Sequence, residues 1–169
     1  MQYDLEKLRK LALRMLPRAQ KNLKKHGSLT PVGLAYDPRG FVHAFTLVWA
    51  NVVEKRKAQR NFQLELLKLD AFAAVIISET WAKFADDGPI DLSDQSVSVR
   101  DMPRRRNATL VEAGSSFGRV VIVQTFRKIK ARKFSFDMLR EFSTEMVDLT
   151  SEFLDADWPV HGDRNQTLH

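Results

Sequence analysis

The sequence predicts a single α+β domain in which helices pack on a mostly antiparallel five-stranded sheet, in the element order α-β-β-α-β-β-β-α. Apolar residues recur at helical spacing in three separate segments. Between these segments lie paired runs of β-branched and aromatic residues, joined by turns that contain Gly or Pro. The 169 residues suit one domain, which we place at residues 1–157 with a polar C-terminal tail at 158–169.

The first helix is predicted at the N-terminus, where apolar residues three and four apart run from Leu5 to Leu23. Gly27 supplies a stop signal, and the basic residues just before it suit the negative end of a helix. Pro17 removes a helical donor inside this segment, so the segment is either kinked there or divided into two shorter helices, and we expect a kink.

A hairpin is predicted next, within residues 29–50, because Asp37-Pro38-Arg39-Gly40 has the composition of a tight turn. Helical spacing returns from Val52 to Leu69 and predicts a second helix. The apolar run Ala71–Ile77 fits either a buried helix or a buried strand, and its β-branched end favours a central strand.

A long loop is predicted from Asp86 to Asp101, a segment rich in aspartate and serine. It is followed by a second hairpin, with strands at 108–113 and 119–129 joined across Gly114–Gly118. A closing helix is predicted with Ser135 as its N-cap. Its apolar stripe consists of Leu139, Phe142, Met146, Leu149 and Phe153.

This element order is similar to that of roadblock, longin and profilin-like domains, in which helices pack against a five-stranded sheet. The resemblance covers most of the chain at the level of topology, and no family motif is matched residue by residue. It implies a scaffolding, dimerising or partner-binding role rather than catalysis, although a fold does not fix a function.

Candidate catalytic groups are few. The chain has no cysteine, which excludes thiolate chemistry and thiolate metal sites. Gly114–Gly118 matches G-x-S-x-G, but a strand pattern follows where the nucleophile elbow needs a helix, so a hairpin turn is favoured. Glu79 follows an apolar run, where a carboxylate can serve in acid-base chemistry or simply pair with an arginine. The four histidines lack metal-ligand spacing, so we expect no metal and no cofactor.

Charge is distributed unevenly along the chain. Residues 1–26 carry a net charge of +6 and residues 103–133 a net charge of +8, whereas residues 134–169 carry −6. The second basic segment can neutralise phosphates, and its candidate binding residues are Arg104, Arg105, Arg106, Arg119 and Arg127. The alternative is that the closing helix neutralises these groups through Glu141, Glu145, Asp148, Glu152 and Asp155.

Three functional hypotheses follow. The first is a small cytoplasmic module without catalytic activity that binds a protein partner or a second copy of itself. The second is nonspecific binding of a nucleic acid or phosphate ligand through the basic hairpin. The third is an enzyme with a site around Glu79 and residues 86–101. We expect neither export nor membrane insertion, because the N-terminus lacks the apolar core of a signal peptide and no apolar run approaches the length of a membrane span.

Overall fold

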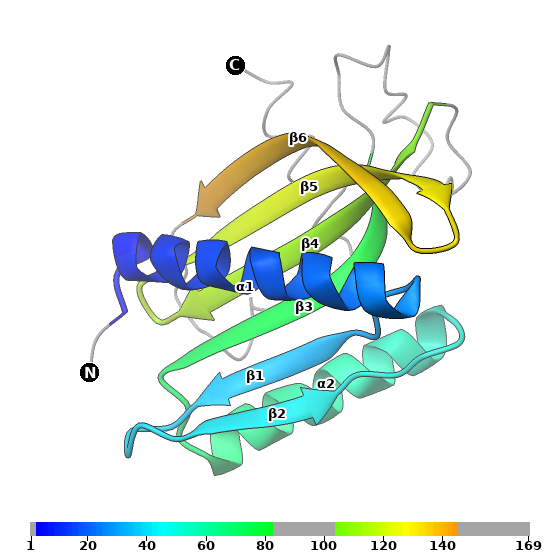
Figure 1. Cartoon of the computed structure of the whole chain (residues 1–169). Coiled ribbons are helices and arrows are strands. Elements are labelled where there is room, and N and C mark those ends of the chain that lie inside the picture. The colour runs from blue at the N-terminus through cyan, green and yellow to red at the C-terminus, as the bar shows by residue number, and fades with distance from the viewer. Residues whose placement is uncertain (1–2, 83–103, 145–169) are drawn as a thin grey trace, which may run out of the picture.

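The computed structural model describes residues 3–82 and 104–144. Its elements are α1 (Leu5–His26), β1 (Val32–Tyr36), β2 (Val42–Thr46), α2 (Val52–Lys68), β3 (Ala73–Ala82), β4 (Arg106–Ser115), β5 (Gly118–Lys130) and β6 (Lys133–Thr144). The strands form one antiparallel sheet in the order β2-β1-β3-β4-β5-β6 (Figure 1). The α+β class is confirmed, but the sheet has six strands rather than the predicted five.

Local signals in the sequence set both ends of α1. The Asp4 side chain accepts a hydrogen bond from the Lys7 backbone N–H at 2.9 Å, and Gly27 adopts a left-handed φ of 79° while its N–H donates to the Leu23 carbonyl. The helix runs unbroken through Pro17, so the alternative of two shorter helices is wrong.

The second helix and both hairpins agree with the sequence prediction. The Asn51 side chain caps α2 by accepting from the Glu54 N–H at 2.9 Å, while the Glu54 carboxylate accepts from the Ala50 N–H at 2.7 Å. The predicted run from Ala71 to Ile77 enters β3 at Ala73, and this strand lies inside the sheet between β1 and β4. Gly114–Gly118 spans the β4–β5 turn, with Ser115 paired to Gly118, and is not a nucleophile elbow.

The predicted start of the closing helix is wrong, because Lys133–Thr144 forms β6 and pairs with β5. Ser135, expected to be an N-cap, lies opposite Arg127 in this ladder. The segment satisfies two periodicities at once, since Phe134, Phe136 and Met138 alternate along a strand while Leu139 and Phe142 also have helical spacing. Pairing with a 13-residue neighbouring strand decides between them.

Four sequence expectations fall on residues outside the described ranges. They are the loop at 86–101, the later part of the apolar stripe at 146–153, the tail at 158–169, and the neutralising role of Glu145, Asp148, Glu152 and Asp155.

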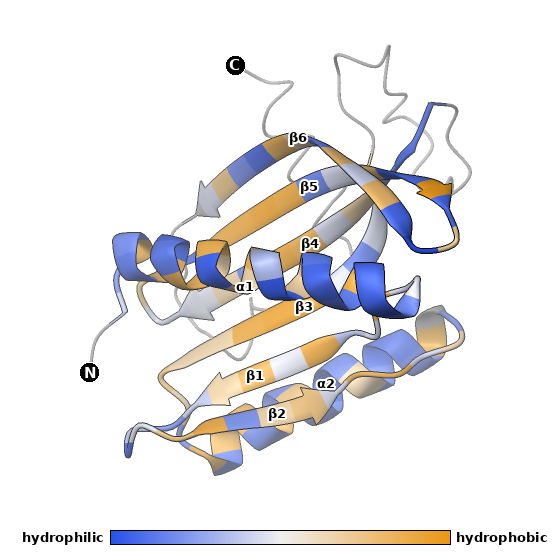
Figure 2. Ribbon diagram, in the orientation of Figure 1, coloured by the Kyte–Doolittle hydropathy of each residue, from blue (hydrophilic) through white to orange (hydrophobic). Residues whose placement is uncertain are grey.

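The core lies on both faces of the sheet (Figure 2). On one face, Leu8, Leu11 and Met15 of α1 pack against residues of β3, β4 and β5 such as Val75 and Val111. The C-terminal half of α1 continues this contact over the β5–β6 hairpin. On the opposite face, α2 packs its own apolar side on β1 and β3 through Phe62 and Leu66. The sheet is therefore apolar on both sides.

Gly33 of β1 allows the close approach of α2. A Cβ atom placed on it would lie 2.7, 2.8 and 3.0 Å from three atoms of the Phe62 ring. We therefore expect Gly33→Ala to lower the free energy of unfolding by about 1–3 kcal/mol, the usual cost of overpacking. Urea denaturation measures this change.

Phe62→Leu supplies the control. If the ring causes the clash, Gly33→Ala has a smaller effect in the Phe62→Leu background than in the natural chain. Additive effects of the two substitutions would contradict this explanation.

Candidate functional site

The fold divides the predicted arginine site into two parts. Arg106 begins β4, and Asn107 pairs with Phe126, so Arg104, Arg105 and Arg106 lie at the same end of the sheet as Arg127. Arg119 lies near the β4–β5 turn, eight residues away along β5, which is about 26 Å in an extended strand. These five arginines therefore do not converge on one site.

Arg119 belongs to a shielded ion pair. Its Nη1 atom lies 3.5 Å from Oε1 of Glu112, and the two side chains are only 13% and 5% exposed. Neither residue of such a pair is easily replaced, because loss of one would leave the charge of the other unpaired and poorly solvated. Arg119 therefore stabilises the sheet through its contact with Glu112 and is not exposed for binding a ligand.

The other basic residues of this segment meet the end of α1. The β5–β6 turn lies beside the last turn of the helix (Figure 1), and a Cβ atom on Gly27 would be 3.3 Å from the Ala131 carbonyl oxygen and 3.9 Å from Lys128 Nζ. Two basic segments about 80 residues apart in the sequence are therefore neighbours. We call this surface the basic end. Its exposed members include Lys21, Lys24, Lys25, Arg104, Arg105, Arg127, Lys128, Lys130, Arg132 and Lys133.

Most of this charge is not neutralised by an ion pair in the described part of the chain. Arg127 Nε lies 3.1 Å from Asp137 Oδ2, and Lys24 Nζ lies 5.3 Å from the centroid of the Phe136 ring. Within residues 3–82 and 104–144, no ion pair holds Lys128, Lys130, Arg132 or Lys133. An anion that approached the turn would meet these ammonium and guanidinium groups in water.

Glu79 has a structural partner in the backbone. Its Oε2 atom accepts a hydrogen bond from the Leu29 N–H at 3.1 Å, which ties the segment after α1 to β3. Sequence analysis offered an arginine as the structural partner of Glu79, but the partner in the structure is the backbone amide of Leu29. Residues 86–101, the other part of the enzyme hypothesis, lie outside the described residues.

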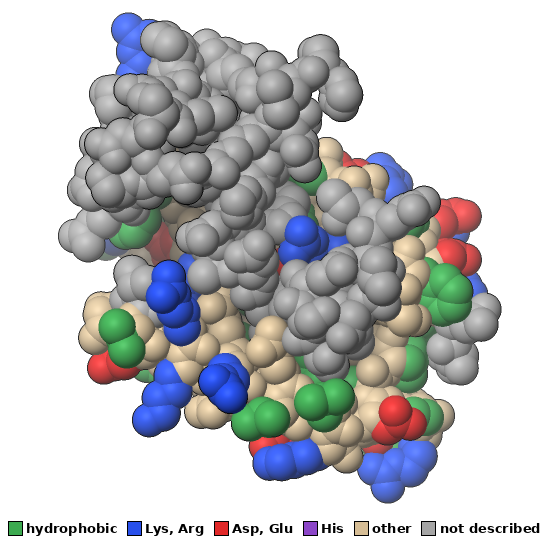
Figure 3. Space-filling model, turned by 180° about the vertical axis from the view of Figure 1, so that it is seen from behind, with side chains coloured by type: hydrophobic (Ala, Val, Ile, Leu, Met, Phe, Trp, Pro, Cys, Tyr) green, Lys and Arg blue, Asp and Glu red, His purple; other side chains and the backbone are tan. Residues whose placement is uncertain are grey.

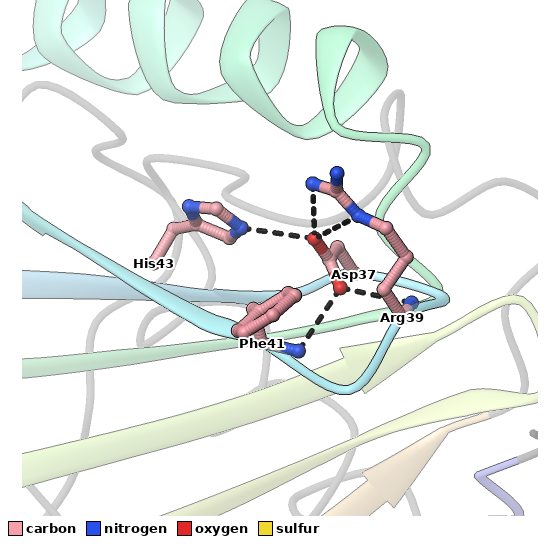
Figure 4. Close-up of polar contacts among 4 residues, drawn as sticks. All are labelled: Asp37, Arg39, Phe41 and His43. Atoms are coloured by element: carbon pink, nitrogen blue, oxygen red, sulfur yellow. Dashed lines mark hydrogen bonds and ion pairs between the residues drawn. The ribbon is translucent and has the colours of Figure 1, made fainter.

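Sequence analysis missed a polar cluster at the β1–β2 turn (Figure 4). Oδ1 of the buried Asp37 accepts from the backbone N–H groups of Arg39 and Phe41 at 2.9 and 3.0 Å. Oδ2 lies 2.8 Å from Arg39 Nη2 and 3.1 Å from His43 Nε2. The sequence shows an aspartate at the first position of a turn, which is a signal for hydrogen bonds to the turn backbone. The position of His43 beside Asp37 depends in addition on the register of β1 and β2, which the sequence does not show.

These contacts keep Asp37 ionised. Burial raises the pKa of its carboxyl, but hydrogen bonds from His43, from Arg39 and from the Phe41 amide outweigh burial and hold the pKa well below the usual range of aspartate. Both oxygens are occupied, so the carboxylate is poorly suited to accept a proton from a substrate. The cluster instead fixes the hairpin tip that carries the exposed Phe41.

Because the Asp37 pKa is lower in the folded protein than in the unfolded chain, its contribution to stability is present above about pH 4 and is lost as pH falls through the folded pKa. We expect Asp37→Asn to lower Tm at pH 7. The difference from the natural chain should shrink as the pH is lowered below about 4. Thermal unfolding over a pH series measures both effects.

Asp70→Asn, an equal charge change at an exposed turn, is the control and should leave Tm nearly unchanged. A Tm difference for Asp37→Asn that stays constant down to the lowest pH would contradict the role of the ionised carboxylate.

The described residues hold no group of metal ligands and no membrane-spanning helix. Within residues 3–82 and 104–144, no three His, Asp or Glu side chains are grouped so that they could hold a metal ion. Neither described helix has the length and apolar character needed to cross a membrane. No family model, no curated protein and no solved structure matches this chain.

Proposed function

We propose that this protein is a binding protein without catalytic activity whose basic end holds the phosphate backbone of a nucleic acid. The observation that carries the proposal is the meeting of two basic segments, the last turn of α1 and the β5–β6 turn, at one end of the molecule. A duplex presents about one phosphate charge per 1.7 Å of its axis, and clustered cations bind it by releasing its counterions.

The positive potential at this end comes from the side chains. The C-terminus of α1 carries a partial negative charge, which stabilises Lys24 and Lys25 but would repel an anion. The binding energy therefore has to come from the lysines and arginines, above all from the turn residues Lys130, Arg132 and Lys133. Such contacts depend strongly on salt concentration.

The composition of the basic end supports binding that is independent of base sequence. Its contacts would be made chiefly by lysine ammonium groups, which position a phosphate backbone but carry no sequence information. The nearby ring of Phe134 is buried beneath the surface, so it offers no open platform for stacking a base.

Fluorescence anisotropy with random DNA and RNA, titrated at several salt concentrations, tests the proposal. The variant Lys130→Ser/Arg132→Ser/Lys133→Ser should weaken binding at least about tenfold at low salt. For a duplex it should reduce the slope of log affinity against log salt by about 2 to 3, because three phosphate contacts are lost.

A matched control is available on α2, which lies on the other face of the sheet. Arg56→Ser/Lys57→Ser/Arg60→Ser removes the same number of charges and should leave the salt slope unchanged. Absence of binding by the natural chain at low salt, or an equal loss in both triple variants, would overturn the proposal.

A second candidate is self-association through α2. Three apolar side chains on this helix, Val53, Leu64 and Leu67, are 77%, 47% and 60% exposed. Hydrophobic side chains lie among basic ones on the part of the surface where α2 runs (Figure 3). Exposed apolar residues with a polar rim are typical of protein contacts. The edge strand β2, next to β1, offers further exposed apolar residues such as Val42.

Light scattering coupled to size exclusion checks this candidate. We expect a dimer for the natural chain and a monomer for Leu64→Gln/Leu67→Gln, because the apolar contact is removed. Lys57→Gln/Lys68→Gln, on the same helix, should remain a dimer. A natural chain that is monomeric at every concentration would exclude self-association.

A further inference from the structure

One part of the sheet is uncovered on the side of α1. The helix crosses β3, β4 and β5, and no described element lies in front of β1 and β2 (Figure 1). Phe45 of β2 packs on Phe62 of α2, so the alternate residues of β2 lie on the opposite side, which is the side of α1. We call this surface the ledge. Its residues are Val32, Leu34 and Tyr36 of β1, which are half-buried, and Val42, Ala44 and Thr46 of β2, which are exposed.

A row of basic side chains borders the ledge. On one flank of α1, Arg9 pairs with Glu141 of β6. Gln20, on the same flank, donates a hydrogen bond to Gln124 of β5. The other flank therefore faces β1. It carries four exposed basic residues at spacings of four, three and four, which we call the basic row: Arg14, Arg18, Lys21 and Lys25.

The Tyr36 side chain lies where the row meets the ledge. Burial raises the pKa of Tyr36, and the positive charges of Arg14 and Arg18 act in the opposite direction, so both guanidinium groups lie near the phenol. The Tyr3 ring lies beside those of Tyr36 and Phe72, with centroids 6.3 and 5.2 Å away. All three rings are half-buried. This end of the ledge therefore presents aromatic surface next to two cations.

The row has no acidic neighbour on its own helix. Glu6 is the one acidic residue of α1, and it pairs with Lys10. Among the residues that the structure describes, no carboxylate forms an ion pair with a member of the row. Lys21 and Lys25 belong to the basic end as well, so positive charge is continuous from Arg14 to the β5–β6 turn.

We infer that the ledge and the basic row hold a single-stranded nucleic acid, with its phosphates along the row and its bases on the ledge. Single strands are bound by surfaces that combine a positively charged track with side chains on which bases can stack. A duplex keeps its bases stacked inside, so an apolar ledge adds little to its binding. The inference rests on the proposed function, because it names the class of nucleic acid that the basic end would bind.

The dimensions suit a short stretch of one strand. The row from Arg14 to Lys25 extends along about 16 Å of helix, and the five residues of β1 span about 17 Å. With one phosphate per about 3.4 Å, this length corresponds to about five phosphates of a stacked strand. Four cations over that distance can neutralise most of them.

Fluorescence anisotropy tests the inference, with labelled single strands of DNA and of RNA and with the duplexes of the same sequences. We expect the natural chain to bind the single strands at least about threefold more tightly at the same salt concentration. Tyr36→Leu should weaken single-strand binding at least about fivefold, the lower limit for one stacked base, and leave duplex binding unchanged. Tyr36→Phe keeps the ring and should retain single-strand binding.

A second variant avoids the half-buried ring. Ala44 is exposed on the ledge, and Ala44→Glu places a negative charge beside the bound strand, so single-strand binding should fall about fivefold. Asn61→Glu adds the same charge at an exposed position of α2, on the other face of the sheet, and should leave single-strand binding unchanged.

The outcomes separate this inference from the proposed function. No binding of any of these nucleic acids by the natural chain at low salt would overturn both. Duplex binding as tight as single-strand binding, or equal losses from Ala44→Glu and Asn61→Glu, would overturn the inference alone. Displacement of the single strand by poly-glutamate at equal charge concentration would also overturn it, because the row would then bind an acidic protein segment equally well.

Discussion

A single sheet with two apolar faces is the constraint on which the rest of this structure depends. Exposed apolar surface on either face would oppose folding, so each face needs its own cover. The N-terminal helix supplies that cover on one side because its apolar stripe is long enough to cross from β3 to β5. On the other side α2 reaches only the strands next to its own hairpin. The distribution of apolar residues thus sets the layer order, with α1 on one face of the sheet and α2 on the other.

The same packing gives the charged groups their positions. The apolar stripe of α1 faces the sheet, so the lysines and arginines of the helix lie on its exposed side, and Arg9 there forms an ion pair with Glu141 of β6. The end of the helix lies beside the β5–β6 turn, because Leu23 of α1 packs with Phe126 and Phe134 of that hairpin in one apolar cluster. The basic end is therefore a consequence of core packing, and its shape should be as rigid as the helix and hairpin that form it.

Local signals predicted most of the elements, and long-range pairing accounts for the main error. The stop at Gly27 and the turn at Asp37–Gly40 act within a few residues, so the sequence reveals them directly, and the Asp4 cap is a local signal of the same kind that sequence analysis did not use. The choice between helix and strand after Lys133 depends on a partner strand that no local pattern displays. The arginine site was wrong for a different reason, because Arg119 and Arg127 lie eight residues apart on the one extended strand β5 and therefore at opposite ends of the sheet, a separation that the predicted strand at 119–129 already implied. The Asp37 cluster needed the register of two strands before His43 could be placed.

The outer edge of β6 has a consequence for the behaviour of the protein at high concentration. In the described sheet this strand pairs only with β5, so alternate residues along its length of twelve direct their backbone N–H and C=O groups away from the sheet. Such an edge can recruit an identical strand from another molecule and begin aggregation. Two irregularities in the β5–β6 register and the charged side chains of Lys133, Asp137 and Arg140 oppose that pairing. The part of this protection that depends on charge is screened as salt is added, so we expect pairing between β6 edges to become easier at high salt.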